Sequence, residues 1–360
     1  MVEKTIVWSY ILRRLLLMIP TLLGVMFITF VVIQFVPGGP VEQMVAQLQG
    51  RQGGLEAGGG APAGPAAPGA GGYRGRQGVD AAKVEEIRKL YGFDKPAHER
   101  FLQMIGQFAR LDLGRSFFQN KPVAELIREK LPVSITIGLW TFLLTYLVSV
   151  PLGIAKAVRA GSAFDTGTTF LVLLGNSIPA FVLGVVLLVY FAGGSFVQWF
   201  PLRGLTSTNW DQLSLWGKVT DYVWHITLPV VAMVVGGFAV ITILVKNSVL
   251  EEIRKQYVLT ARTKGVAEDK VLWRHVFRNA LIPIMTGFPA AFIGAFFSGA
   301  LLIETLFSLD GLGLLSYESV IRRDYPVVFG TLFVFTLIGL LTNLVRDLGY
   351  IWADPRVKYE

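Results

Sequence analysis

The chain has 360 residues, of which 53% are hydrophobic and only 16% are charged, and its mean hydropathy is positive. Because a soluble domain carries roughly 25% charged residues, this composition argues against a soluble globular protein. The net charge of +8 would indicate nucleic-acid binding in a soluble protein, but the positions of the basic residues have a topological explanation, and no nucleic-acid partner is expected. The absence of cysteine excludes disulfides, thiolate metal sites and cysteine nucleophiles.

Long uncharged apolar blocks run along the chain, and a membrane-spanning helix needs about 20 such residues. Read between charged residues, the blocks are Leu15–Val36, Leu131–Ala155, Thr166–Leu202, Tyr222–Val245, Asn279–Ile303 and Tyr325–Val345. The third block is too long for one span and breaks at Gly193-Gly194, which places its helix at about 168–192. A backbone in hydrocarbon must satisfy its own hydrogen bonds. The sequence therefore predicts an all-α integral membrane fold with six transmembrane helices.

Lys and Arg are distributed unevenly among the segments between these blocks. They concentrate in the N-terminal segment, in the loop 247–280 and in the C-terminal tail, and they are few in the short loops after the third and fifth blocks. Since positive charge marks cytoplasmic loops, both termini are expected in the cytoplasm. The predicted parts are a cytoplasmic N-terminus with the first span over 1–36, an external insert over 37–130, a transmembrane core over 131–349 and a cytoplasmic tail over 350–360.

The external insert has two halves of different composition. Its middle, Gly50–Gly78, is dense in Gly, Pro and Ala and is expected to be a flexible loop. From residue 80 to residue 130 the pattern becomes helical, with short helices expected over 80–91, 96–111 and 122–131. Such helices would form a small cap that either packs only on the spans or contacts a partner that delivers substrate.

No arrangement of residues typical of an enzyme is present in the sequence. The histidines His98, His225 and His275 lie far apart, and His225 is interpreted as a residue at the membrane boundary. The chain has no GxSxG elbow, and Gly217-Lys218 lacks the preceding glycine of a phosphate-binding loop. We therefore expect no catalytic residue, no metal and no cofactor, and if ATP drives transport its hydrolysis belongs to another polypeptide.

The loop between the fourth and fifth blocks is the longest and most charged of the predicted cytoplasmic segments. Its pattern predicts a helix over Glu252–Lys264 that ends at Gly265, because glycine readily takes the left-handed conformation beyond a helix end. A second helix is expected over Ala267–Phe277. Ala261 and Gly265 would form a shallow face for another protein's groove, with Arg262 and Lys264 at its rim. The alternative is that these two cations only meet anionic headgroups.

This loop carries a resemblance to a known family. Tyr257-Val-Leu-Thr-Ala-Arg-Thr-Lys-Gly265 and His275-Val-Phe-Arg-Asn-Ala-Leu-Ile-Pro283 resemble the EAA-type coupling loop of ABC-importer permeases of the dipeptide and oligopeptide family. Leu259 and Thr260 stand where that motif has its glutamate and first alanine, a variation common in the peptide branch. Further similarities are Leu131-Pro-Val-Ser-Ile-Thr136, Glu304-Thr-Leu-Phe-Ser-Leu-Asp-Gly-Leu-Gly-Leu-Leu315 and Asp354-Pro-Arg356.

The resemblance implies a function and a set of partners. The stretch Tyr91–Arg100 and Phe200–Leu205 point to the YejB-type branch, associated with uptake of oligopeptides and the peptide antibiotic microcin C, and the alternative is a permease of another dipeptide or nickel-type importer. Such a subunit would lie in the bacterial inner membrane among lipids. It would pair with a homologous permease, two cytoplasmic ATPase domains and a periplasmic peptide-binding protein. The residues implied in coupling to the ATPase are Tyr257, Thr260, Ala261, Arg262, Lys264, Gly265, His275, Arg278 and Asn279.

Small and polar residues within the apolar blocks are the candidates for the translocation pathway. The small residues Gly287, Ala291, Ala295 and Gly299 recur every four positions, a spacing that permits close helix packing within the subunit or a sliding interface with its partner. Asn176, Ser177 and Pro179 indicate either a pathway lining or a packing kink. Glu304 could face an outer vestibule or bond to the backbone of Ser308–Gly313. A self-contained channel or carrier and a membrane enzyme are the competing classes. The first would not need the coupling loop, and the second would need an intramembrane catalytic cluster, which the sequence lacks.

Overall fold

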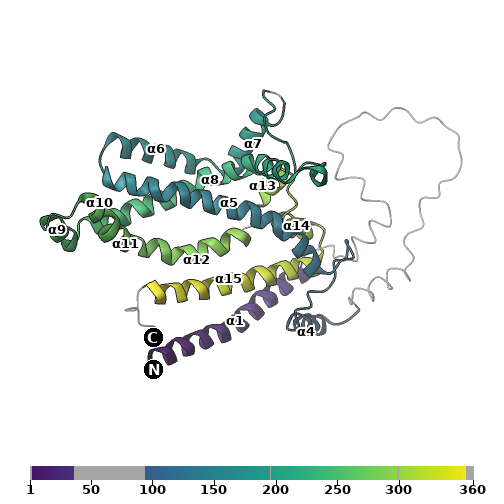
Figure 1. The fold of residues 1–360 in the computed structure, drawn as a ribbon. Helices are drawn as coiled ribbons and strands as arrows, with labels where there is room; N and C mark the ends of the chain where they lie inside the picture. The colour runs from purple at the N-terminus through teal and green to yellow at the C-terminus, as the bar shows by residue number, and fades with distance from the viewer. Residues whose placement is uncertain (1, 36–93, 195, 298–299, 354–360) are drawn as a thin grey trace. The chain divides into compact units, whose positions relative to one another are not determined.

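The computed structural model describes residues 2–35, 94–194, 196–297 and 300–353, and every regular element within those ranges is helical. The helices are α1 (Val2–Gln34), α4 (Ala97–Phe108), α5 (Val123–Val158), α6 (Ala163–Ser177), α7 (Ala180–Phe191), η2 (Trp210–Gln212), α8 (Leu215–Ile253), α9 (Gln256–Thr263), α10 (Glu268–Lys270), the π-helix η3 (Val271–Val276), α11 (Phe277–Ala280), α12 (Ile282–Phe297), α13 (Leu301–Leu306), α14 (Leu312–Ile321) and α15 (Tyr325–Ala353) (Figure 1). The all-α prediction is confirmed for these residues.

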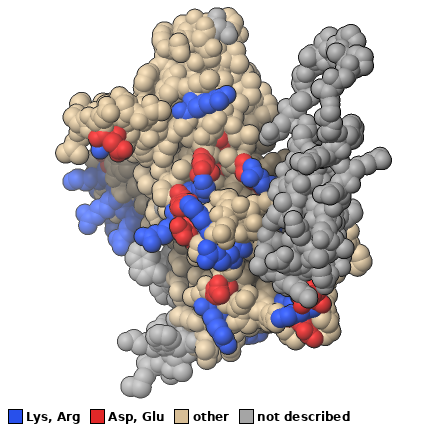
Figure 2. Space-filling view, turned by 90° about the vertical axis from the view of Figure 1, so that its right-hand side faces the viewer, with Lys and Arg blue, Asp and Glu red and all other residues tan. Residues whose placement is uncertain are grey.

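Four described helices are long and apolar enough to cross a membrane. They contain the stretches Ser9–Gln34, Val123–Val158, Leu215–Ile253 and Tyr325–Leu348, and α6 with α7 forms a fifth candidate that is bent by 91°. The block expected to be the fifth span yields α12, whose 16 residues extend about 24 Å and fall short of the roughly 30 Å hydrocarbon core. Figure 2 shows a face on which Lys, Arg, Asp and Glu side chains gather along the middle and at the left edge, with uncharged surface around them. The count of six spans stays a prediction.

The predicted third span is interrupted at Ile178 and Pro179, beside the polar residues that indicated a kink. α6 ends at Ser177 and α7 begins at Ala180, so a single helix over 168–192 is wrong, although α7 does end at Phe191, close to the predicted boundary. The cause is Pro179, because a proline disfavours the helical conformation of the residue before it. Ile178 accordingly has an extended backbone, with φ −91° and ψ 117°.

Of the helices predicted in the external insert, one is present and another is part of a longer helix. The helix expected over 96–111 is confirmed as α4, and Pro96 precedes its first residue. A separate short helix over 122–131 is wrong, because α5 begins directly after Pro122 and continues unbroken through Pro132 into the second predicted span. The loop Gly50–Gly78 and the helix over 80–91 lie outside the described residues.

The chain packs as two units. The smaller comprises residues 19–126 and 318–333. In it Phe101 of α4 packs its ring 5.2 Å from that of Phe30, and buried Asp324 accepts hydrogen bonds from the Ser116 hydroxyl and the Phe117 amide at 2.5 and 3.0 Å. These contacts hold α4 and the loop that follows it within this unit.

The larger unit comprises residues 1–18, 127–317 and 334–360, and α8 is its central element. α6, α7, α11 and α12 all pack against α8. Gly153 of α5 lies so close to α8 that a Cβ atom there would stand 2.6 Å from the Val245 Cβ and 2.8 Å from the Thr242 carbonyl oxygen. The absence of a side chain at Gly153 is therefore what lets α5 approach α8.

This close approach gives the first prediction. Gly153→Ala should lower the melting temperature of the purified protein, because overpacking costs about 1–3 kcal/mol and outweighs the roughly 0.5–1 kcal/mol gained when alanine replaces glycine in a helix. The matched control is Gly167→Ala in α6, where an added Cβ meets nothing within 4 Å. Thermal unfolding in detergent checks both variants, and an equal melting temperature for the two would contradict the packing described here.

Candidate functional site

The charged loop after the fourth apolar block leaves the membrane region as a direct extension of α8. The predicted helix over Glu252–Lys264 is wrong in its beginning, because α8 continues to Ile253 and α9 starts only at Gln256. Between them Lys255 has an extended backbone, with ψ 148°, and its ammonium group pairs with the Glu252 carboxylate. The change of direction therefore falls at Arg254 and Lys255, where solvated charges replace the apolar sequence.

Gly265 ends α9 as expected. Its φ is +77°, the left-handed region, and no atom lies within 4 Å of the place where a Cβ would stand. After Gly265 the chain returns through α10, the π-helix η3 and α11, so helical structure over Ala267–Phe277 is confirmed, with a wider turn in its middle. Residues 247–280 thus form two helical limbs, and this element is called the coupling segment below.

The coupling segment has an apolar core of its own. Val258 and Ala261 of α9 pack with Val271 and Val276 of η3, and all four are buried. The expectation that Ala261 lies on an exposed docking face is wrong, because the residue is only 8% exposed and packs against the second limb. Helical periodicity alone did not show which face of α9 the second limb would cover.

The exposed side of α9 carries the residues that remain available to another protein. These are Leu259, Thr260, Arg262, Thr263, Lys264 and Gly265. Arg262 also forms an ion pair with Glu268 of the second limb, at 2.9 Å between Nε and the carboxylate. An exposed ion pair contributes little to stability, about 0–1 kcal/mol, so Arg262 keeps its capacity for a stronger contact elsewhere.

Polar contacts join the base of the two limbs. The Tyr257 hydroxyl accepts a hydrogen bond from the Asn279 amide nitrogen at 2.9 Å and lies within bonding distance of the Glu252 carboxylate. Asn279 also donates to the His275 carbonyl at 3.2 Å. Burial raises the pKa of Tyr257 above its usual value, which keeps its proton available for donation. Of the predicted coupling residues, these three fix the segment internally, whereas Arg278 is exposed.

The described pathway residues lie at the break between α6 and α7, in α12 and, for Glu304, in α13. Asn176, Ser177 and Pro179 are exposed at the break between α6 and α7, and the Ser177 hydroxyl donates to the Leu173 carbonyl at 2.8 Å. In α12, Ala291 is exposed, and Gly287 and Ala295 are partly exposed. Gly299 lies outside the described residues. The described residues contain no group of His, Asp and Glu side chains that could hold a metal ion.

Glu304 is buried and bonds to the backbone of the first turn of α14. It is 1% exposed and accepts hydrogen bonds from the Leu314 amide at 2.7 Å and the Ser134 hydroxyl at 3.2 Å. A Cβ at Gly311 would stand 2.5 Å from the Glu304 carboxyl carbon, so the loop needs a glycine there. Glu304 is a structural residue of the α13–α14 turn.

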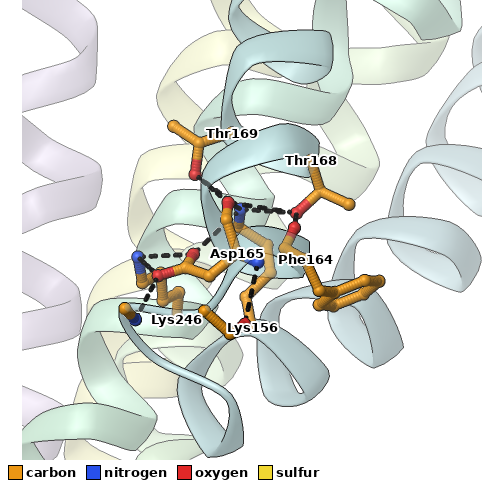
Figure 3. A network of polar contacts seen from close by, with 8 residues as sticks. Lys156, Phe164, Asp165, Thr168, Thr169 and Lys246 are labelled. Atoms are coloured by element: carbon orange, nitrogen blue, oxygen red, sulfur yellow. Dashed lines mark hydrogen bonds and ion pairs between the residues drawn. The ribbon is translucent and has the colours of Figure 1, made fainter.

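Sequence reasoning missed a cluster of charged residues in the larger unit. Lys156 of α5, Asp165 of α6 and Lys246 of α8 meet in an ion-pair network (Figure 3). Lys156 is 0% exposed, and Lys246 places its Nζ 2.7 Å from each carboxylate oxygen of Asp165. The available signal was that all three charges border apolar blocks, but the lysines were interpreted only as markers of topology.

The φ of Gly265 gives a second prediction. Gly265→Val should destabilise the turn that joins α9 to α10, because the left-handed conformation costs a residue with a side chain about 1–2 kcal/mol. Gly265→Asn is the matched control, since asparagine tolerates that conformation. Limited trypsin cleavage after Lys264 measures the effect, and it should be faster in the valine variant than in the asparagine variant. Equal cleavage rates would show that the segment does not depend on this φ.

Comparisons with known proteins agree with this architecture. Residues 149–359 match the family described as the binding-protein-dependent transport system inner membrane component. The chain is 54% identical to the peptidoglycan transport system permease protein YejB of Agrobacterium fabrum, with 98% of both chains covered, and 53% identical to the inner membrane ABC transporter permease protein YejB of Escherichia coli O157:H7, with 98% of this chain and 99% of the relative covered. It is 32% identical to the di/tripeptide transport system permease protein DppB of Pseudomonas aeruginosa, over 98% of this chain and 99% of the relative. The chain therefore belongs to the family of inner-membrane permease components of binding-protein-dependent ABC transport systems.

Proposed function

We propose that this chain is a permease subunit of an ATP-driven importer that carries oligopeptides across the bacterial inner membrane. The family assigns the chain a transport role in the membrane, with ATP hydrolysis on a separate subunit and substrate delivered by a binding protein. Relatives at 54%, 53% and 32% identity over almost the whole chain are named as permeases of peptidoglycan, ABC and di/tripeptide transport systems. Peptides are the substrate class that these names favour. The inclusion of microcin C-like peptides rests only on the resemblance of Tyr91–Arg100 and Phe200–Leu205 to the YejB-type branch.

The coupling segment is the observation that carries this proposal. It extends directly from α8, it is rigid because it has its own buried core, and it presents an exposed face on α9. A short rigid element of this kind suits a groove in an ATPase subunit. It can then transmit a change in nucleotide state to the spans, since a packed interface shifts between discrete arrangements.

The proposal includes a topology and a partner. Both termini and the coupling segment lie in the cytoplasm, because the coupling segment contains the densest group of Lys and Arg. A second, homologous permease completes the pathway, with the exposed break at Asn176–Pro179 and the small residues of α12 at or near the shared interface. α12 with its neighbouring helices supplies the predicted fifth span, which brings the number of spans to six. Uptake of labelled oligopeptides and peptidoglycan fragments by cells that lack or carry the gene tests the substrate class.

The exposed face of α9 gives a third prediction. Thr260→Trp should abolish retention of the ATPase in the purified complex, because a misfit at a packed interface centre costs on the order of 2–4 kcal/mol. Thr220→Trp is the matched control, because both threonines are exposed and each donates its hydroxyl to the carbonyl four residues earlier, at 2.9 and 3.1 Å. Retention measured by affinity purification should be lost only in the first variant. If Thr260→Trp retains the ATPase, α9 is not the docking element.

The basic residues at the rim give a fourth prediction. Lys264→Ala should weaken ATPase retention modestly and more at low than at high salt, because rim charges mainly steer association. Arg262→Ala should weaken it further, since a guanidinium can form paired hydrogen bonds with a carboxylate.

Glu268→Gln separates the two roles of Arg262, because it removes the internal ion pair and leaves the arginine in place. Retention should then stay near that of the parent. The measurement uses detergent-purified complex with lipid removed. Equal retention for Arg262→Ala and the parent would indicate that this cation contacts headgroups instead.

A further inference from the structure

The charged cluster of the larger unit fixes the first turn of α6 to both neighbouring helices. Lys156 of α5 donates to the Asp165 carbonyl at 2.8 Å and to the Thr168 and Thr169 hydroxyls at 2.8 and 2.6 Å. Lys246 of α8 donates to both carboxylate oxygens of Asp165, and the Gly161 amide donates to the same carboxylate at 3.1 Å (Figure 3). Asp165 is thus the one residue of the cluster bonded to α5, to α8 and to the turn before α6.

α6 is attached to α8 at its other end as well. A Cβ at Gly175 would stand 2.9 Å from the Val235 Cγ1 and 3.1 Å from the Val235 carbonyl oxygen, so the helices touch backbone to side chain there. Between these two points α6 runs along α8. Because α6 is attached to α8 at two separated points, by ion pairs at one and by close packing at the other, the two helices should move together as one rigid body.

The same part of α8 leads into the coupling segment. Val245, the neighbour of Lys246, and Val249 pack in one buried core with Ile154 of α5 and with Val258 of α9. The chain of contacts therefore runs from α9 through the cytoplasmic part of α8 to Asp165. From there α6 leads to its end at Ser177, where the backbone bends by 91° beside the candidate pathway residues.

We propose that Asp165 is a positioning residue for transport: it makes α6 move with α8, so that a displacement of the coupling segment reaches the break at Ile178–Pro179. This inference rests on the proposed function, because it requires the coupling segment to receive the motion of an ATPase. A carboxylate suits this role better than an apolar contact. Its two oxygens are held by a lysine from each side and by a backbone amide, so α6 can neither slide nor rotate on α8 without separating buried charges.

The experiment compares coupling with assembly. The full transporter, with its ATPase and binding protein, is reconstituted in liposomes with Asp165→Asn, Lys246→Met or Lys246→Arg, and Arg322→Gln serves as a control that removes an exposed ion pair, with Glu318, at 3.3 Å. Asp165→Asn and Lys246→Met should retain the ATPase, while peptide imported per ATP hydrolysed falls by about fivefold or more. Lys246→Arg should restore this ratio, and the double variant Asp165→Asn with Lys246→Met should be no worse than either single variant.

A distance measurement gives a readout that stability alone would not change. The chain has no cysteine, so spin labels can be placed at Ala160→Cys, in the turn before α6, and at Asp269→Cys, in the second limb of the coupling segment. Both positions are exposed. In the parent the distance between the labels should be the same without ATP and in an ATP-trapped state, and in Asp165→Asn it should broaden or differ between the states.

Three outcomes would overturn the proposal. The first is a distance between the labels in the parent that differs between the two states. The second is an unchanged ratio of peptide imported to ATP hydrolysed in Asp165→Asn. The third is loss of the ATPase from Asp165→Asn or Lys246→Met, which would mean that the cluster only supports the docking segment. If Asp165→Asn does not insert into the membrane, the parent distance and the two Lys246 variants still decide. Failure of the proposed function is recognised separately, because Thr260→Trp would then retain the ATPase.

Discussion

The continuity of α8 is the constraint on which the rest of the larger unit depends. In hydrocarbon a helix satisfies its backbone hydrogen bonds internally, so an interruption at membrane depth is costly. α8 has 39 residues and passes Pro229 without ending, and its last turns extend beyond the apolar block. α6, α7, η3, α11 and α12 all contact it. Because one uninterrupted helix carries both the contacts in the membrane and the base of the coupling segment, the two regions cannot move independently at that point.

The coupling segment shows how a short loop becomes a rigid element. Its two limbs share four buried residues, and polar bonds from Tyr257 and Asn279 join them at the base. Docking to another subunit costs less when the loop is already ordered, because side-chain and backbone freedom need not be lost on binding. The inward position of Ala261 belongs to this arrangement: a small residue there lets α9 lie close to η3, and the exposed residues beside it are left to meet the partner.

Asp165, Glu304 and Asp324 are buried carboxylates that each fix a turn or loop, and Asp165 and Glu304 do so through donors on more than one segment. Asp165 holds the turn between α5 and α6, Glu304 holds the turn before α14, and Asp324 holds the loop after α4. A buried charge is costly unless it is paired and hydrogen-bonded, so each of these turns has a narrowly defined geometry. The break at Ile178–Pro179 has no such carboxylate in its described contacts, and there the chain bends by 91° within an apolar block.

The sequence by itself determined the features that depend on local composition. Apolar block length indicated the membrane class, the helical pattern over 96–111 indicated α4, and Gly265 indicated the end of α9. Each of these features follows from residues within a few positions of one another. The coupling motif likewise lies within one short segment, so its resemblance to the permease family could be read directly.

Only the tertiary structure decided which surfaces are covered. The burial of Ala261 depends on Val271 and Val276, which lie on the other limb, and the continuity of α5 through Pro132 spans the boundary between an insert and an apolar block that look different in sequence. Asp165 and Lys246 are 81 positions apart, and nothing in the pattern around either residue names the other as its partner. Helical periodicity indicates which residues share a face of one helix. Which charges pair and which faces are buried depends on which helices the fold brings together.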